Sequence, residues 1–202
     1  DHSGFLPRLV KEGYGGPIYC TPATRDLLGV MLLDSARLQE EEAEYASRRQ
    51  YSRHKPALPL YNQEDARRCL KLLEGVPYRE QFEPVAGLPF RFVPAGHILG
   101  SAFAFADTEA GTVLFSGDLG RYNQTIIHDP TPVDHADYLL VGSTYGDRAH
   151  QDVDVPAALE RIVKRAVAER GFVLVPSFAV GRTQEVLYLL HELRAAGRIP
   201  AI

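Results

Sequence analysis

The spacing of apolar residues in the first third of the chain is helical. Residues 4–13 predict a short helix that ends at a glycine, and residues 17–20 predict a short strand. Thr21 and Pro22 supply an N-cap and a first-turn proline for a longer helix. Its apolar side chains recur at three- and four-residue steps, at Leu27, Leu28, Met31 and Leu32. The charged stretch 35–45 continues this helical pattern.

A basic, polar stretch follows, and it predicts a loop over residues 48–55. The usual interpretation of such a charge run is a solvated face. Asn62 then begins a further helix that we expect to run to Leu73, with Asp65 at the capping-box position.

From residue 78 the pattern changes to the alternation that is typical of strands. Apolar side chains alternate over residues 88–92 and 103–105, and β-forming runs occupy residues 111–115 and 138–141. The last part of the chain predicts helix 156–169, strand 172–175 and helix 182–194. Strands that give way to a helix, strand and helix predict an α/β fold.

A polar linker near residue 148 predicts a domain boundary. We assign residues 1–148 to one domain and residues 149–202 to the beginning of a second α/β domain, because one strand and two helices are too little to bury a core of their own.

Composition narrows the class of protein. The 202 residues are 45% hydrophobic and 24% charged, and no apolar run approaches the roughly 20 residues of a membrane span. A net charge of −4 argues against binding nucleic acid by bulk positive charge. It does not argue against a nucleic-acid enzyme, because bound divalent cations add positive charge. Cys20 and Cys69 form no CxxC pair, which favours a reduced, cytoplasmic setting and a packing role for both.

Histidine and aspartate side chains stand beside glycines at three separate places: Asp1-His2-Ser-Gly, Ala-Gly-His97-Ile-Leu-Gly and Ser-Gly-Asp118-Leu-Gly. Carboxylate and neutral imidazole suit Zn²⁺, and glycine lets the backbone turn sharply around an ion. These residues therefore indicate part of a dinuclear metal site. The competing interpretation of a single histidine such as His97 is a hydrogen-bonded loop residue.

In this order, the three segments resemble the ligand motifs of the metallo-β-lactamase fold. The long helical insert, the segment Ser143-Thr-Tyr-Gly-Asp and the segment Pro176-Ser-Phe-Ala-Val-Gly-Arg-Thr-Gln-Glu resemble the β-CASP branch of that fold. This branch contains RNA-processing nucleases related to the cleavage and polyadenylation endonuclease. The resemblance implies a partial αββα sandwich, followed by the start of a β-CASP domain.

The resemblance also implies roles for individual residues. His97 would bind the first of two Zn²⁺ ions, Asp1 and His2 the second, and Asp118 would bridge both, with Asp1 and Asp118 as the catalytic carboxylates. A bridging water would attack the phosphorus of RNA. Ser143, Thr144, Tyr145, Ser177 and Arg182 are the candidate substrate-binding residues. The helix start at Arg182 could hold a phosphate, and the hydroxyls of residues 143–145 could also support the metal ligands. The alternatives are an ordinary polar turn at residues 143–145 and a plain helix start at Arg182.

Three departures from the family pattern bear on activity. The motif's two leading histidines and its later histidines have no counterpart in the sequence, and Gly142 stands where the family has a supporting glutamate. We therefore expect the 202-residue chain to be an inactive fragment of a zinc-dependent ribonuclease. The alternatives are a non-catalytic RNA-binding scaffold and a metallo-β-lactamase-fold hydrolase of small molecules. The expected partner is RNA and not a membrane, with a homodimer among the alternatives for oligomeric state.

Overall fold

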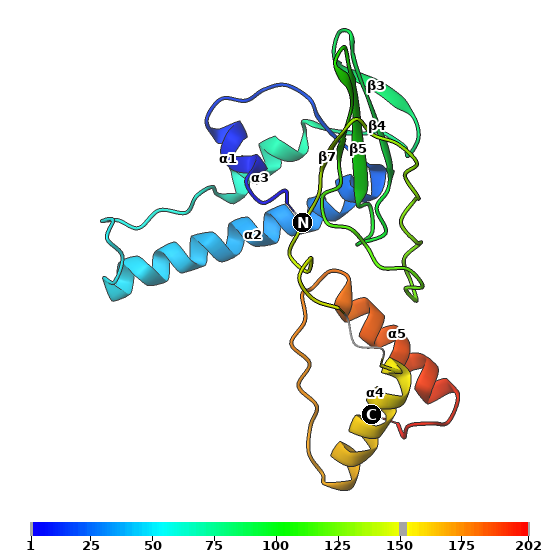
Figure 1. The fold of residues 1–202 in the computed structure, drawn as a ribbon. Helices are drawn as coiled ribbons and strands as arrows, with labels where there is room; N and C mark the ends of the chain where they lie inside the picture. Colours follow the sequence, from blue (N-terminus) through cyan, green and yellow to red (C-terminus); the bar gives the residue numbers. More distant parts are fainter. Residues whose placement is uncertain (1, 150–152, 202) are drawn as a thin grey trace.

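The computed structural model describes residues 2–149 and 153–201 and shows a mixed α/β fold (Figure 1). A parallel pair of short strands, β1 (Ile18–Cys20) and β2 (Leu73–Gly75), forms one sheet. The second sheet has five strands in the order of the chain: β3 (Gln81–Val85), β4 (Leu88–Pro94), β5 (Ala102–Thr108), β6 (Gly111–Phe115) and β7 (Tyr138–Leu140).

Within the five-stranded sheet, β3 to β6 are antiparallel and β7 lies parallel to β6. The alternation at Phe103 and Phe105 sends both rings into a core with Val93, Ala95 and Leu114. Residues 95–101, which contain His97, connect β4 to β5, and Asp118 follows the end of β6. The two predicted ligands therefore lie at the same end of neighbouring strands in this sheet.

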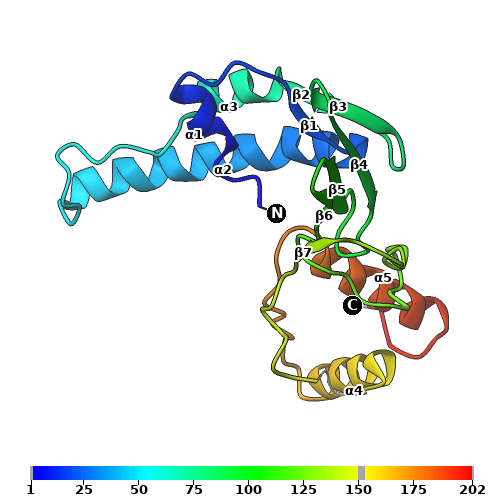
Figure 2. The same cartoon turned by 45° about the horizontal axis from the view of Figure 1, so that its top comes forward.

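Three helices, α1 (Leu6–Lys11), α2 (Pro22–Arg49) and α3 (Gln63–Leu70), pack together on one side of the molecule (Figures 1 and 2). Leu32 and Tyr61 are almost fully buried in the apolar cluster between them. The predicted start of α2 is confirmed, because Thr21 accepts a hydrogen bond from the Thr24 amide. The helix continues for 28 residues to Arg49, beyond the predicted loop boundary.

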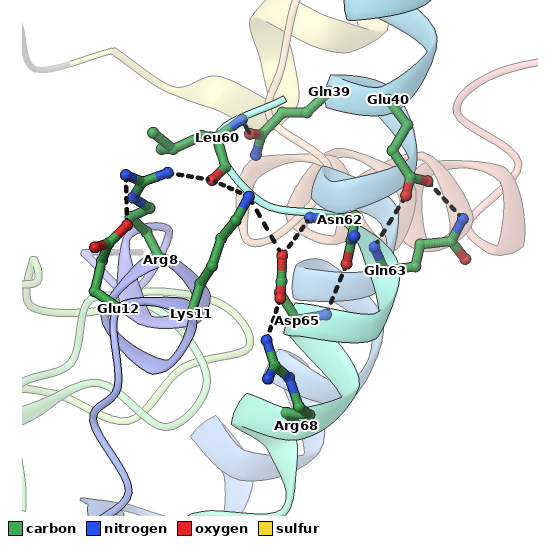
Figure 3. A network of polar contacts seen from close by, with 10 residues as sticks. All are labelled: Arg8, Lys11, Glu12, Gln39, Glu40, Leu60, Asn62, Gln63, Asp65 and Arg68. Carbon is green, nitrogen blue, oxygen red and sulfur yellow. Dashed lines mark hydrogen bonds and ion pairs between the residues drawn. The ribbon is translucent and has the colours of Figure 1, made fainter. Parts of the chain in front are cut away.

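A polar network around the buried Asp65 fastens α3 to its neighbours (Figure 3). Asp65 and Asn62 exchange the two hydrogen bonds of a capping box, as the spacing predicts. The Asp65 carboxylate also contacts Arg68 and lies 3.6 Å from Lys11 Nζ on α1. Burial opposes ionisation of Asp65, but the Asn62 amide, Arg68 and Lys11 together outweigh it and hold the pKa of this carboxyl below its ordinary value.

The last two helices, α4 (Val155–Ala168) and α5 (Arg182–Ala195), form a separate pair with their own small apolar cluster of Val163, Leu193 and Ile199. In both views they lie on the opposite side of the molecule from α1 and α3 (Figures 1 and 2). The domain boundary near residue 148 stays a prediction.

Three expectations about secondary structure are wrong. Arg48 and Arg49 belong to α2 and not to the loop. The helix that begins after Asn62 ends at Leu70, and Leu73 begins β2, where it pairs with Ile18 of β1. The apolar run 172–175 forms no strand, because among the described residues no neighbouring strand pairs with it, and Phe172 and Leu174 are largely exposed.

Both cysteines are free thiols, with Cys69 buried in the helical cluster. None of the helices within residues 2–149 and 153–201 is long and apolar enough to cross a membrane.

Candidate metal centre

The loop that carries His97 is closed on itself by one serine. Ser101 Oγ accepts hydrogen bonds from the amides of His97 at 3.0 Å and Ile98 at 3.2 Å. The Ser101 carbonyl accepts a third from the Ala95 amide at 3.2 Å. These short-range bonds fix the backbone that presents the imidazole.

The same loop is attached to the beginning of α2 through the buried carbonyl of Gly100. Thr21 Oγ1 and Thr24 Oγ1 both donate to Gly100 O, at 2.8 Å and 3.0 Å. A Cβ atom on Gly100 would lie 2.5 Å from the Thr24 amide nitrogen, and the residue has a φ of +85°. Only glycine suits this position, because the backbone here has a left-handed conformation and passes very close to the start of α2.

The segment that carries Asp118 is held against the His97 loop. The Gly120 amide donates to Ala95 O at 2.9 Å, and a Cβ atom on Gly120 would lie 1.7 Å from Gly96 O. The side-chain amide of Gln124 also donates to Gly96 O. The backbones of the His97 loop and of the Asp118 segment are therefore in direct contact. This contact restricts the distance between His97 and Asp118.

His2, His97 and Asp118 converge although they are far apart in the sequence. His2 Nε2 lies 3.4 Å and His97 Nε2 3.6 Å from the same atom, Asp118 Oδ2. The side chains of His97 and Asp118 are each 34% exposed, and that of His2 is 70% exposed. The other predicted ligand, Asp1, lies outside the described residues.

These separations can be compared with those around a zinc ion. Zinc bonds of about 2.0–2.2 Å in a tetrahedral arrangement place two ligand atoms about 3.4 Å apart. A direct charge-assisted hydrogen bond between imidazole and carboxylate would be shorter, at about 2.7–2.9 Å. Each His–Asp118 pair thus fits zinc in donor type and in spacing. Within residues 2–149 and 153–201, however, no group of three or more His, Cys, Asp or Glu side chains is arranged so that it could hold a metal ion.

A pocket of about 260 Å³ opens beside these side chains. His2, His97 and Asp118 stand on its wall, and its apolar lining comes from β1, β4 and α2, including Tyr19, Leu28, Met31 and Phe92. Cys20 also lines it. Burial, opposed by the nearby charge of Arg25, raises the pKa of the Cys20 thiol. A protonated thiol is a poor metal ligand, which agrees with the packing role that the sequence predicts.

The predicted substrate residues Ser143, Thr144 and Tyr145 are exposed and form a turn just after β7. The Gly146 amide donates to Ser143 O at 3.0 Å, and the Arg148 guanidinium lies 5.9 Å from the Tyr145 ring centre. None of the three lines the pocket, within the part of the chain that the structure describes.

Gly142, immediately before this turn, lies next to the proposed bridging carboxylate. Its amide donates to Ser116 Oγ at 3.1 Å, and a Cβ atom on it would lie 3.7 Å from Asp118 Oδ1 and 3.0 Å from Gly117 O. A longer side chain at this position would therefore begin beside Asp118. The sequence departure at Gly142 thus falls within the candidate site.

Ser177 and Arg182 lie in the connection to α5 and at its first position. Ser177 Oγ is 2.9 Å from Thr183 Oγ1, and Arg182 Nε is 3.6 Å from Glu185 Oε2. A Cβ atom on Gly181 would lie 3.2 Å from the side chain of Ile98. The structure therefore brings the start of α5 next to the residue that follows His97, but it does not bring Arg182 into the pocket lining.

Sequence reasoning missed the residues that position the ligand loops. The sequence indicates Thr21 only as a helix cap and assigns no role to Thr24, Ser101 or Gln124. The Thr21-Pro22 pair and the Gly100-Ser101 pair were visible signals, but their partners lie up to 79 residues away in the chain.

Comparison with known proteins places these observations in context. No family model matches the chain. It is 35% identical over 192 residues to ribonuclease TTHA0252 of Thermus thermophilus, which covers 95% of this chain and 40% of that protein. It is 33% identical over 209 residues to transcription termination factor FttA of Methanosarcina mazei, covering 100% of the chain and 31% of that protein.

Endoribonuclease ysh1 of Schizosaccharomyces pombe is 30% identical over 195 residues, which is 95% of the chain and 24% of that protein. The chain thus spans less than half the length of the curated relatives that it matches. The similarity extends over nearly the whole chain, and the mixed α/β fold with its paired ligand loops agrees with it. The chain belongs to the β-CASP family of metallo-β-lactamase-fold RNA nucleases.

Proposed function

We propose that the full-length protein, of which this chain is a part, is a zinc-dependent ribonuclease that hydrolyses RNA phosphodiester bonds. The observation that carries the proposal is the convergence of His2 and His97 on one oxygen of Asp118, at 3.4 Å and 3.6 Å, beside an open pocket. Two relatives named as ribonucleases, from Thermus thermophilus and Schizosaccharomyces pombe, support the substrate class.

The candidate site residues form two groups, one that would hold zinc and one that would position RNA. His97 and His2 would each hold one of two zinc ions, with Asp1 joining His2, and Asp118 would serve both ions. A carboxylate suits this place because it is negatively charged and each of its oxygens has two lone pairs, so that Oδ2, which both histidines approach, could serve both cations. When bound, the ions would lower the pKa of a shared water to about 7 and stabilise the oxyanions of in-line displacement. Ser143, Thr144, Tyr145, Ser177 and Arg182 would hold phosphates of the RNA, with the side chain of Arg182 as the bidentate donor.

The test compares Asp118→Asn and His97→Gln with His191→Gln in the full-length protein. His191 is an exposed histidine on α5 and serves as a matched control. Zinc retained after dialysis is measured by atomic spectroscopy, and cleavage of a fluorescent single-stranded RNA is followed on gels. We expect the first two variants to lose zinc and cleavage and the control to keep both. Full cleavage by protein stripped of metal with a chelator would contradict the proposal.

One observation favours a second candidate function, a non-catalytic RNA-binding scaffold. Gly142 stands beside Asp118 Oδ1 and supplies no side chain where the family has a glutamate. Loss of a group that supports a metal ligand typically costs about 10- to 100-fold in metal affinity or activity. On the scaffold hypothesis, the native protein binds RNA without cleaving it.

Gly142→Glu, with Gly142→Gln as the uncharged control, decides between the two functions. The new Cβ meets Gly117 O at 3.0 Å, so the backbone must shift by only a few tenths of an ångström. If the native protein is a weak enzyme, the glutamate variant should cleave RNA about 10- to 100-fold faster and the glutamine variant should not. If the native protein binds RNA, cleaves none, and gains activity only with the glutamate, it is a scaffold.

A further inference from the structure

The far end of α2 carries an exposed basic and aromatic surface, which we call the tip patch and define as Tyr45, Arg48, Arg49, Tyr51, Arg53 and Lys55. Residues 45–55 contain four Lys or Arg residues and no acidic residue, in a chain whose net charge is −4. Attraction of the helix C-terminus for cations explains Arg48 and Arg49. It does not explain Arg53 and Lys55, which lie beyond the end of the helix.

Two of the three arginines of the tip patch contact an aromatic ring, and within the described residues neither forms an ion pair with a carboxylate. The guanidinium groups of Arg48 and Arg49 lie 5.8 Å and 5.6 Å from the centre of the Tyr45 ring. Glu44 precedes Arg48 by the four residues that suit a helical ion pair, yet the two do not pair. Within residues 2–149 and 153–201, none of the four cationic side chains of the patch forms an ion pair, so their charge is available to a ligand.

The nearest acidic side chains cancel only part of this charge. Glu40 accepts hydrogen bonds from Gln63, and Glu41 pairs with Arg37 at 2.9 Å (Figure 3 shows the first of these). Glu42 and Glu44 stand at the edge of the patch, but four cations face these two carboxylates over residues 42–55.

Two tyrosines supply exposed aromatic surface within the same patch. The Tyr45 and Tyr51 rings lie 6.2 Å apart between centres, and Tyr51 is 61% exposed. Tyr51 also stands on the wall of a groove of about 280 Å³ between α2 and the returning segment 51–60. Exposed rings beside arginines form the kind of platform on which the bases of a single strand stack.

The segment that returns from the tip is fixed to the helix by side chains of α2. Ser47 Oγ accepts from the Ala57 amide at 3.0 Å. Gln39 Oε1 accepts from the Leu60 amide at 3.2 Å, and Figure 3 shows this second hydrogen bond. The patch is thus held in place before a ligand arrives, which reduces the entropy lost on binding.

We propose that the tip patch binds single-stranded RNA, with its cations on phosphates and Tyr51 stacked on a base. This inference rests on the proposed function, because it extends the same substrate away from the candidate metal centre. The 28 residues of α2 span about 42 Å at 1.5 Å per residue, and the opposite end of the helix holds the His97 loop. At about 3.4 Å per stacked nucleotide, roughly 12 nucleotides cover that distance. A stacked RNA strand must be longer than this to reach both places.

The test uses the full-length protein and the variant Arg53→Gln/Lys55→Gln, with Arg161→Gln/Arg165→Gln as a control of equal charge change. Arg161 and Arg165 are exposed on α4. Binding of 5′-fluorescein oligouridylate of about 24 nucleotides is measured by anisotropy between about 50 and 200 mM salt. The patch variant should bind about fivefold more weakly. Its slope of log affinity against log salt should be shallower by about 1.4, since each phosphate contact on a single strand contributes about 0.7. The control should match the native protein.

Substitution of Tyr51 tests the stacking separately from charge. Tyr51→Ala should weaken binding of the same RNA by about 5- to 150-fold, the range that corresponds to loss of one stacked base. Tyr51→Phe keeps the ring and should restore native affinity. Equal affinity for the alanine and phenylalanine variants would contradict the stacking role.

Cleavage kinetics distinguish failure of this inference from failure of the proposed function. The patch variant should raise KM for the RNA of about 24 nucleotides at unchanged kcat, and leave KM for one of about 6 nucleotides unchanged. If the native protein cleaves RNA and the patch variant has native KM and affinity, the inference is wrong and the proposed function stands. If the native protein cleaves neither RNA, the proposed function fails, and the salt slope of binding alone decides on the patch. Weaker binding to phosphatidylserine vesicles with unchanged RNA affinity would assign the patch to a membrane surface and overturn the inference.

Discussion

The carbonyl of Gly100 offers a quantitative test of how the His97 loop is held. It is buried and accepts from two hydroxyls, Thr21 Oγ1 at 2.8 Å and Thr24 Oγ1 at 3.0 Å. Thr21 is itself only 2% exposed and also caps α2 through the Thr24 amide. Replacing either threonine with valine removes one donor and keeps the shape of the side chain, and replacing both leaves the carbonyl without a side-chain donor.

The free energies of unfolding should not add. Thr21→Val loses a helix cap, worth about 1 kcal/mol, and one hydrogen bond, worth about 1 kcal/mol. Thr24→Val loses about 1 kcal/mol, because Thr21 still donates to Gly100 O. The double variant should lose about 1–3 kcal/mol more than the sum, since a buried carbonyl without a donor carries its full desolvation cost.

Urea unfolding followed by circular dichroism measures all three variants in one double-mutant cycle. Thr125→Val is the control, because Thr125 is exposed, and it should change the free energy of unfolding by less than about 0.5 kcal/mol. A double variant whose loss equals the sum of the single losses within about 0.5 kcal/mol would refute shared support of Gly100 O.

Three further changes test the fold in the same assay. Gly120→Ala should lower the free energy of unfolding by at least about 2 kcal/mol, because its Cβ would lie 1.7 Å from Gly96 O. The control Gly29→Ala on α2 meets nothing within 4 Å and should raise the free energy of unfolding by up to about 1 kcal/mol. Equal effects of the two changes would contradict the close approach at Gly120. Leu32→Ala in the helical cluster should cost about 2–5 kcal/mol, against almost nothing for the half-exposed Leu38→Ala, and a native midpoint would contradict its burial. The pKa of Asp65 is lower in the folded state, so ionised Asp65 stabilises the fold above the ordinary carboxyl pKa of about 3.9, and this stabilisation is lost as the pH falls through the lower folded-state pKa. Asp65→Asn should remove that part of the acid dependence of the free energy of unfolding. An unchanged pH profile of unfolding would contradict this role of Asp65.

Local signals in the sequence predicted local structure correctly. Thr21-Pro22 and the Asn62/Asp65 capping box begin α2 and α3 as expected, because each depends on groups within three residues of one another. The alternation at Phe103 and Phe105 also gave the buried face of β5. Such patterns are set by helix and strand periodicity, so they need no knowledge of the rest of the chain.

Local patterns did not predict strand pairing between segments that are distant in the sequence. Leu73 continues the helical pattern after Asn62, but it pairs with Ile18, 55 residues earlier, and forms a strand. The apolar run 172–175 has strand composition, but a strand needs a hydrogen-bonded neighbour, and within the described residues it has none. Whether such a segment forms a strand therefore depends on a partner strand that no local pattern reveals.

The sequence alone indicated which side chains are candidate zinc ligands, because donor chemistry belongs to the residue type, and the order of the His97 and Asp118 motifs indicated the family. The tertiary structure decided that His2 and His97 meet at one oxygen of Asp118 and that Gly142 lies beside the other. It also decided that Thr21 and Thr24 hold the His97 loop. These distances depend on how strands and loops far apart in the chain pack together, and packing follows from all the contacts at once and not from any one segment.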